Sequence, residues 1–129
     1  MIILNFSHPI LPPQIEKIQA LSGELVDQLI DIPVQFENGE NFLDQFQNLM
    51  RQIPLSAEQW QTAPILINLP ALNFIAGLLV AELHGRMGYF PPILRTRLIK
   101  ESLPPRYEIA EIINLQQVRE NARRSRYAE

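Results

Sequence analysis

The sequence predicts an α/β domain built around a mainly parallel sheet, and three observations lead to this fold class. Residues 2–4 and 65–67 are wholly apolar runs of strand length, which are typical of parallel strands buried on both faces. Each run precedes a stretch with helical patterning, as in repeated strand–helix units. The length of 129 residues suits one domain with a substantial core. We therefore expect a single domain over residues 1–129, ending in a β-hairpin and a helix.

The N-terminal third predicts a strand, a helix and a second strand. Residues 2–4 lead into a polar segment that ends at Pro9. Pro12 and Pro13 suit the first turn of a helix, because proline lacks the N–H group that has no helical partner there. Gly23 is expected to end this helix. A second strand is expected within residues 25–36, where Pro33 interrupts it or confines it to the sheet edge.

The clearest amphipathic helix is predicted over residues 42–53, and Pro54 is expected to end it. Its apolar positions recur at helical spacing: Phe42, Leu43, Phe46, Leu49, Met50 and Ile53. Ser56 and Gln59 then form the pattern of a capping box, at the start of a short helical turn that carries Trp60.

Residues 64–88 hold the longest apolar stretch, read as a strand, a loop and a helix. The helix begins at about Leu72 and is apolar at almost every position, so we expect it to be buried on most sides, with Gly85 as its C-cap. The alternative is a membrane span, which needs about twenty apolar residues. Four polar or helix-breaking residues argue against a span: Asn68, Pro70, Asn73 and Glu82.

The C-terminal third predicts a hairpin followed by a helix. Strands over residues 93–99 and 107–113 are expected to pair antiparallel, across a turn at residues 102–105. Arg95 and Arg97 share one strand face and are expected to pair with Glu108 and Glu111 on the other strand. Asn114 suits an N-cap for the last helix, whose expected inner face is Leu115, Val118 and Ala122. Its end carries Arg119, Arg123, Arg124 and Arg126, interpreted as solvated cations that match the helix dipole.

The composition excludes several classes of function. There is no cysteine, hence no disulfide, thiolate zinc site or cysteine nucleophile. The two histidines, His8 and His84, lack metal-ligand spacing, so we expect no metal and no cofactor. A net charge of −3 argues against binding long nucleic acids, which depends on phosphate neutralisation. The start of the chain lacks the pattern of a signal peptide, so a cytoplasmic protein without membrane association is expected.

Polar and small residues follow both apolar strands and predict a binding site. Asn5, Phe6, Ser7 and His8 follow the first strand, and Asn68, Leu69, Pro70, Ala71 and Asn73 follow residues 65–67. The carboxyl ends of parallel strands meet at one edge of a sheet, where ligands bind in α/β folds. Small polar side chains and free N–H groups at helix starts can cradle a phosphate. The alternative is that these side chains only cap turns and helices.

A second polar cluster, His84, Gly85 and Arg86, follows the long apolar helix. Arg86 either contacts a phosphate or a partner subunit, or the cluster only offsets the unpaired carbonyls at the helix end. Catalysis has little support, because Ser7 beside His8 lacks the orienting acid and oxyanion hole of a triad. His8 remains a candidate general acid or base acting on a phosphodiester.

Three segments carry a resemblance to a known family. Residues 5–18, NFSHPILPPQIEKI, are similar to the strand–NHxLTxxQ–helix start of small CRISPR-associated proteins linked to type III systems. Residues 80–86, VAELHGR, and residues 104–124, PPRYEIAEIINLQQVRENARR, are similar to one branch of these proteins. The chain thus resembles stand-alone CRISPR-associated Rossmann-fold (CARF-like) domains. It departs from their start motif at Leu11-Pro12, where Leu-Thr is usual, so the threonine hydroxyl is missing.

The resemblance implies a homodimer that binds a cyclic oligoadenylate second messenger, most specifically cyclic tetra-adenylate, across its two-fold axis. It also raises the expectation of larger assemblies bridged by the ligand. Some relatives resemble ring nucleases, in which a ribose 2′-hydroxyl attacks the adjacent phosphate, and others resemble sponges that only sequester the messenger. Either role damps the antiviral signal.

We expect sequestration rather than an enzyme, because the sequence offers few catalytic groups. Ring nucleases need little beyond positioning and charge stabilisation, so a metal-independent ring nuclease that uses His8 is the alternative. A third possibility is a structural subunit that binds another protein and no nucleotide.

Overall fold

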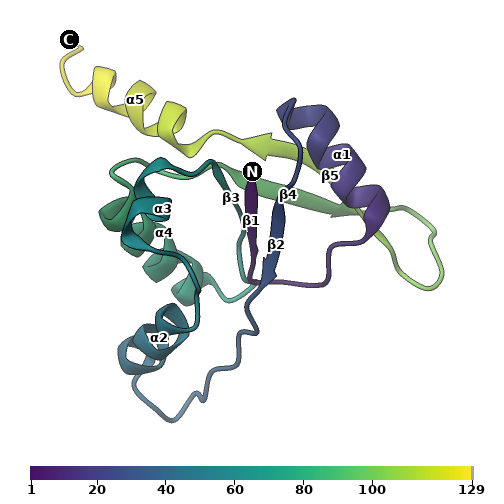
Figure 1. Ribbon diagram of the computed structural model, residues 1–129, viewed down its shortest axis with the longest axis horizontal. Helices are drawn as coiled ribbons and strands as arrows, with labels where there is room; N and C mark the ends of the chain where they lie inside the picture. Colours follow the sequence, from purple (N-terminus) through teal and green to yellow (C-terminus); the bar gives the residue numbers. More distant parts are fainter. Residues whose placement is uncertain (129) are drawn as a thin grey trace.

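The computed structural model describes residues 1–128 and contains one five-stranded sheet with the strand order β2-β1-β3-β4-β5 (Figure 1). The first four strands run parallel, and β5 pairs antiparallel with β4. The strands are β1 (Ile2–Asn5), β2 (Gln28–Asp31), β3 (Ile65–Asn68), β4 (Ile93–Leu98) and β5 (Tyr107–Ile113). The helices are α1 (Pro12–Ser22), α2 (Phe42–Arg51), α3 (Ala57–Thr62), α4 (Asn73–Met87) and α5 (Leu115–Ser125). The predicted α/β class, a mainly parallel sheet with a C-terminal hairpin and helix, is confirmed.

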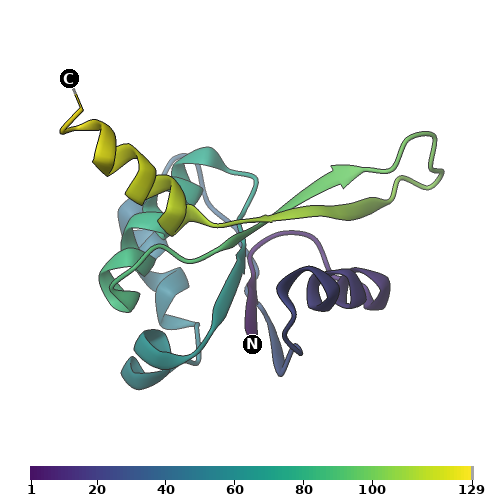
Figure 2. The same ribbon diagram turned by 90° about the horizontal axis from the view of Figure 1, so that it is seen from above.

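The two wholly apolar runs form the centre of the sheet. β1 and β3 pair in register from Ile2 opposite Ile65 to Asn5 opposite Asn68, and every residue of both strands is buried. Both faces are covered, by α1 on one side and by α2, α3 and α4 on the other (Figure 2). This double cover explains why these strands are apolar at every position rather than at alternate ones.

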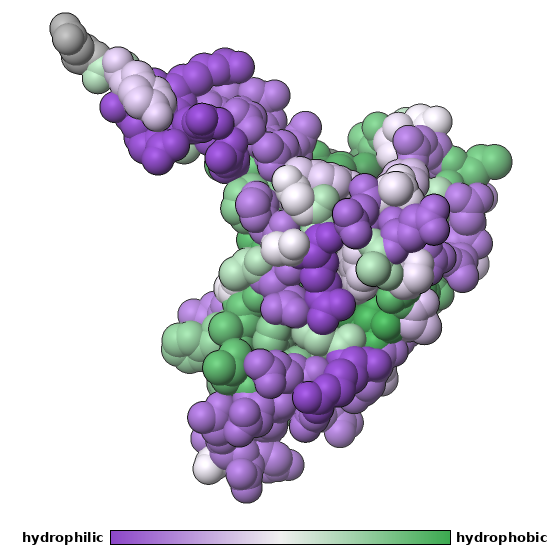
Figure 3. All heavy atoms as spheres, turned by 60° about the vertical axis from the view of Figure 1, so that its left-hand side comes forward, coloured by the Kyte–Doolittle hydropathy of each residue, from purple (hydrophilic) through white to green (hydrophobic). Residues whose placement is uncertain are grey.

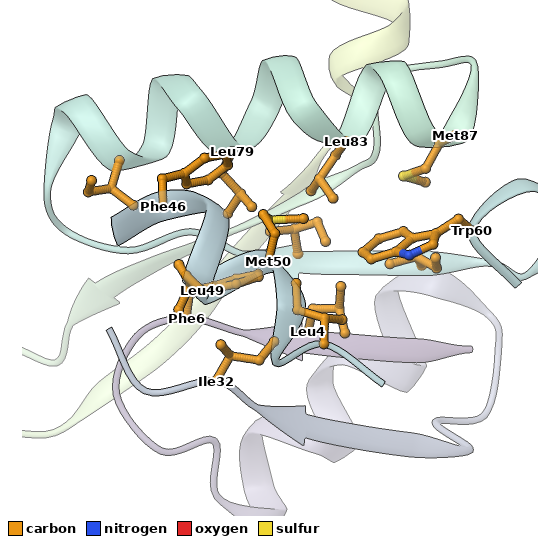
Figure 4. Packing of buried hydrophobic residues seen from close by; sticks show 14 of the residues in the cluster. Leu4, Phe6, Ile32, Phe46, Leu49, Met50, Trp60, Leu79, Leu83 and Met87 are labelled. Carbon is orange, nitrogen blue, oxygen red and sulfur yellow. The ribbon is translucent and has the colours of Figure 1, made fainter. Parts of the chain in front are cut away.

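The larger core lies between the sheet and helices α2, α3 and α4. α4 buries one stripe at a spacing of four residues: Ile75, Leu79, Leu83 and Met87. Figure 4 shows Leu79, Leu83 and Met87 pointing from α4 toward Phe46, Met50 and Trp60. The amphipathic pattern predicted over residues 42–53 is therefore confirmed as the inner face of α2.

Helix ends follow the predicted signals with one exception. Gly23 ends α1 in the left-handed conformation, and Ser56 and Gln59 form the predicted capping box of α3. The prediction that Gly85 caps α4 was wrong, because the helix continues to Met87 and Gly88 provides the left-handed residue at φ 82°. The additional turn lets Met87 bury its side chain in the larger core.

The prediction that α4 is buried on most sides was wrong for the single chain. Only the inner stripe is buried, while Phe74 is 71% exposed and Leu72 is 47% exposed. The reason is the layer order, since within this chain only the sheet side of α4 meets other elements of the core. Among residues 1–128, no helix combines the length and apolar character that a bilayer crossing requires.

The expected inner face of the last helix contacts the domain only at its start, where Leu115 is half-buried, while Val118 and Ala122 are exposed. No residue of α5 is buried, and Val118 is 57% exposed. α5 projects from the body of the domain after β5 (Figures 1 and 2), and its surface is largely hydrophilic (Figure 3). Within residues 25–36 only β2 forms a strand, and it lies at the sheet edge just before Pro33, as predicted.

Candidate functional site

The strand order creates a switch point between β1 and β3. The chain leaves β1 for α1 on one face of the sheet, and it leaves β3 for α4 on the other face. The two connections diverge, and the space between them is where open α/β sheets bind ligands. A crevice of about 360 Å³ lies at this edge. Its lining residues are Ser7, His8, Pro9, Ile10, Gln14, Asn68, Leu69, Ala71, Leu94, Arg95, Thr96, Tyr107 and Ile109.

Asn5 is buried beside this crevice and does not line it. Its side-chain oxygen accepts hydrogen bonds from Asn68 Nδ2 over 2.9 Å and from the Ser7 N–H over 3.1 Å. Its nitrogen donates to the His8 carbonyl over 2.9 Å and to Asp31 Oδ1 over 2.8 Å. These bonds use both lone pairs and both hydrogens of the amide, and the residue is 2% exposed. Asn5 therefore joins β1 to β2, to β3 and to the loop that carries His8.

Ser7 and His8 are exposed on the loop that Asn5 holds in place. The imidazole of His8 lies nearly parallel to the ring of Tyr107, at an interplanar angle of 15° with the ring centroids 6.1 Å apart. Gln14 donates a hydrogen bond from Nε2 to the Tyr107 carbonyl over 2.9 Å, which links α1 to β5. The crevice thus has a wall of two parallel aromatic rings from opposite ends of the chain.

β4 supplies a cation to the same crevice. Arg95 donates from Nε and Nη2 to Glu111 Oε2, over 2.9 and 2.7 Å, and Arg97 donates to Glu108 Oε1 over 2.7 Å. The predicted cross-strand pairs are therefore confirmed. Arg95 nevertheless lines the crevice, whereas Arg97 does not.

The two helices at the switch point differ in their free N–H groups. In α1, Pro12 and Pro13 have no N–H, and the N–H groups of Gln14 and Ile15 both bond to the Leu11 carbonyl. α4 has no side-chain cap from Leu72. In its first turn the Phe74 N–H bonds to Asn73 Oδ1 over 2.9 Å, and no residue of α4 lines the crevice.

A smaller hollow of about 270 Å³ adjoins the crevice, lined by Phe6, Ser7, His8, Val34, Pro70, Ala71 and Leu72. Three residues line both spaces, so Ser7, His8 and Ala71 form the ridge between them. Seven of the residues predicted for the site thus gather here: Phe6, Ser7, His8, Asn68, Leu69, Pro70 and Ala71.

Other predicted site residues lie outside these two hollows. Asn73 lines neither, and its side chain accepts a hydrogen bond from the Phe74 N–H over 2.9 Å. His84, Gly85 and Arg86 lie near the other end of α4, about 16–20 Å from Asn73 at 1.5 Å per helical residue. Within one chain, the structure does not bring this cluster to the crevice.

The cluster at the end of α4 has partners of its own. Arg86 bonds to Glu82 Oε1 over 3.1 Å and lies over the ring of Trp60, 5.6 Å from its centroid. The centroids of the His84 and Phe90 rings lie 4.2 Å apart. Contact of Arg86 with a ligand or a partner subunit stays a prediction.

Sequence reasoning missed the wall contributed by the hairpin, above all Tyr107 and Arg95. The pattern placed Tyr107 correctly at the start of β5, but its position beside His8 depends on packing between α1 and β5. The one signal in the sequence was a tyrosine at the start of a strand that is otherwise rich in isoleucine.

Polar groups outside the crevice show shifted pKa values. Burial raises the pKa of the Tyr89 phenol, which lines a hollow at the opposite edge of the sheet together with Met1 and Pro64. On α5, a hydrogen bond of 2.8 Å from the Arg119 guanidinium lowers the pKa of the Glu120 carboxyl. Neither group belongs to the switch point.

Within residues 1–128, no three histidine, aspartate or glutamate side chains gather in a way that could hold a metal ion. The crevice offers the Ser7 hydroxyl, the parallel rings of His8 and Tyr107, and the Arg95 guanidinium. Comparisons of the chain with protein-family models, with curated proteins and with solved structures give no match.

Proposed function

We propose that this chain binds and sequesters a cyclic oligoadenylate, specifically cyclic tetra-adenylate, and so damps type III CRISPR antiviral signalling. The observation that carries the proposal is the crevice at the carboxyl ends of β1 and β3, where cationic, aromatic and amide groups converge. The resemblance of residues 5–18, 80–86 and 104–124 to small CARF-like proteins supplies the identity of the ligand.

The groups of the crevice suit the phosphates of such a ligand. Arg95 lines the crevice on the β4 side while paired with Glu111, so a phosphate there would share its guanidinium with that carboxylate. Ser7 and His8 line the same crevice on the β1 side and can donate hydrogen bonds to a phosphate. The carboxylate of Asp31 accepts a hydrogen bond from the Asn5 amide at the end of β2, on the side of the crevice away from β4. Phosphates are therefore expected toward β3 and β4.

The aromatic wall suits an adenine base. Unstacked bases of RNA are recognised by stacking on aromatic side chains, which contributes about 1–3 kcal/mol per base. Tyr107 is 46% exposed, and its ring already runs parallel to that of His8. A purine stacked on Tyr107 extends this parallel arrangement.

A ring of four nucleotides is much larger than a cavity of about 360 Å³. One crevice therefore contacts only part of the ring, and two copies of the chain related by a two-fold axis contact one ligand. A symmetric ligand of this kind also links copies into larger assemblies.

Sequestration is favoured over cleavage because His8 is the only histidine, and no carboxylate is present, among the residues that line the crevice. Attack by a ribose 2′-hydroxyl requires a base and a group that protonates the leaving oxygen, or strong charge stabilisation. His8 alone would have to supply most of this chemistry if the chain were a ring nuclease.

The test is incubation of excess protein with cyclic tetra-adenylate without added metal, followed by denaturation and chromatography of the nucleotide. Melting is measured on a second mixture, in which the ligand is in excess over the protein. We expect intact ligand and a raised melting temperature, because a ligand at 100 times its Kd adds about 2.7 kcal/mol of stability. Linear di- or tetra-adenylate would instead make the chain a ring nuclease.

The absence of any melting shift would contradict both ligand-binding functions and leave the structural-subunit alternative. A linear tetra-adenylate control separates recognition of the closed ring from general affinity for adenosine.

A further inference from the structure

The outer face of α4 is apolar and has no partner among residues 1–128. Phe74 is 71% exposed, Gly77, Ala81 and Gly85 are exposed, and Leu78 is half-buried. The inner stripe of the same helix is fully covered. A helix that is apolar all round normally has all its sides buried. α4 therefore lacks a cover on its outer side.

The glycines of this face have no role in the packing of the single chain. A Cβ atom built at Gly77 or Gly85 would meet no atom within 4 Å. Both are interior helical residues, where glycine is less favourable than alanine. A close approach of another backbone gives such glycines a physical reason, and residues 1–128 of the single chain provide no such approach.

The spacing of the outer residues allows this face of α4 to pack against the same face of a second copy. Phe74, Leu78, Ala81 and Gly85 follow one another at intervals of four, three and four residues, the seam of a helix pair. When two copies of this seam run antiparallel, Phe74 of one copy faces Gly85 of the other, and Leu78 faces Ala81. Each of these contacts recurs by symmetry, as an interface about a two-fold axis requires.

The order of large and small residues favours the antiparallel direction. In a parallel pair, Phe74 meets Phe74 and Gly85 meets Gly85, so the helices are held apart at one end and leave a gap at the other. In the antiparallel pair, every level holds one large and one small side chain, which allows even and close packing.

The charges of this helix do not oppose the pairing. The four seam positions carry no charge, and the flanking Glu82 and Arg86 pair with each other over 3.1 Å on their own helix. A second copy therefore meets no unpaired like charge from α4.

We propose that the outer face of α4 is a homodimer interface, in which Phe74 of each copy packs against Gly85 of the other and Leu78 against Ala81, in an antiparallel helix pair. The proposal does not depend on the nucleotide ligand. Its test is made on ligand-free protein, so its outcome is independent of the proposed function.

The first test compares oligomeric state by light scattering for the wild type, Phe74→Arg and Leu103→Arg. Leu103 is 92% exposed on the turn of the β4–β5 hairpin and is the matched control. We expect dimeric wild type, a monomeric Phe74→Arg variant with unchanged circular dichroism, and a dimeric Leu103→Arg variant. A monomeric wild type, or dimers that persist in Phe74→Arg, would overturn the proposal.

The second test determines the direction of the pair, and the chain suits it because it contains no cysteine. Differently tagged Phe74→Cys and Gly85→Cys chains are mixed and oxidised. The antiparallel pair predicts disulfides between the two variants. It predicts none between two Gly85→Cys chains, whose cysteines lie about 16 Å apart along the axis. Disulfides confined to chains of the same variant would overturn the antiparallel arrangement.

Discussion

Asn68 donates a hydrogen bond from its side-chain nitrogen to the side-chain oxygen of Asn5 over 2.9 Å, and both residues are buried at the ends of paired strands. Because β1 and β3 are parallel, residues 63 positions apart in sequence meet at the same edge of the sheet. This amide pair is the structural base of the crevice, and Ser7 and His8 depend on it for their position.

Replacing Asn5 by alanine is expected to destabilise the domain more than a surface substitution. It leaves buried polar groups of Asn68 and the Ser7–His8 loop without partners, and each such group costs about 1–3 kcal/mol. Urea unfolding measures the loss, with the exposed Asn121→Ala as the control. Equal stabilities of the two variants would show that the amide network contributes nothing.

Replacing Tyr107 by alanine is expected to weaken cyclic tetra-adenylate binding about 5- to 150-fold, the equivalent of about 1–3 kcal/mol of base stacking. The matched control is Tyr127→Ala, which removes a tyrosine that is 76% exposed at the end of the chain. Isothermal titration compares the three proteins. A loss of equal size in both variants, or none in Tyr107→Ala, would contradict a base on the aromatic wall.

Replacing Gly85 by alanine is expected to stabilise the isolated chain while weakening the dimer. In the Phe74→Arg background the gain should be about 0.5–1 kcal/mol, because alanine favours the helix and no atom lies within 4 Å of its Cβ position. In the otherwise wild-type chain, the added methyl separates the paired helices and raises the dimer dissociation constant. Denaturation and dilution series measure the two effects. Destabilisation of the monomeric variant would mean that the fold itself requires Gly85.

Replacing Leu79 by alanine is expected to destabilise the domain by about 2–5 kcal/mol, because its side chain is fully buried in the larger core. Leu103→Ala, at an exposed position, is expected to change the free energy of unfolding by less than about 0.5 kcal/mol. Chemical denaturation of both variants checks the contrast. A small effect at Leu79 would contradict the packing in Figure 4.

Cyclic tetra-adenylate is expected to drive dimers into larger assemblies. An antiparallel α4 pair places the two crevices at opposite ends of the dimer, so a ring shared by two crevices joins separate dimers. Light scattering during titration with ligand should rise for the wild type. The Phe74→Arg variant should still bind ligand but stop at pairs of chains. Unlimited growth of that variant would show that assembly does not use the α4 interface.

The sequence alone determined the class of fold and most of its elements. Wholly apolar runs at residues 2–4 and 65–67 had to be strands buried on both faces, and local signals marked the ends of α1, α2 and α3. These strands and helix ends depend on residues only a few positions away, so they can be predicted from the sequence alone. The same logic placed Asn5 and Asn68 at one edge of the sheet, since parallel strands align their carboxyl ends.

Only the tertiary structure decided which groups meet at that edge and which apolar residues are covered. Tyr107 reaches His8 because α1 packs on β5, an arrangement that no local pattern encodes. Hydrophobicity along α4 indicated burial on most sides, but burial depends on which elements surround a helix. The single chain covers only one stripe of α4. The sequence indicated that α4 needs further apolar contacts, but only the three-dimensional structure showed which of its residues lack them.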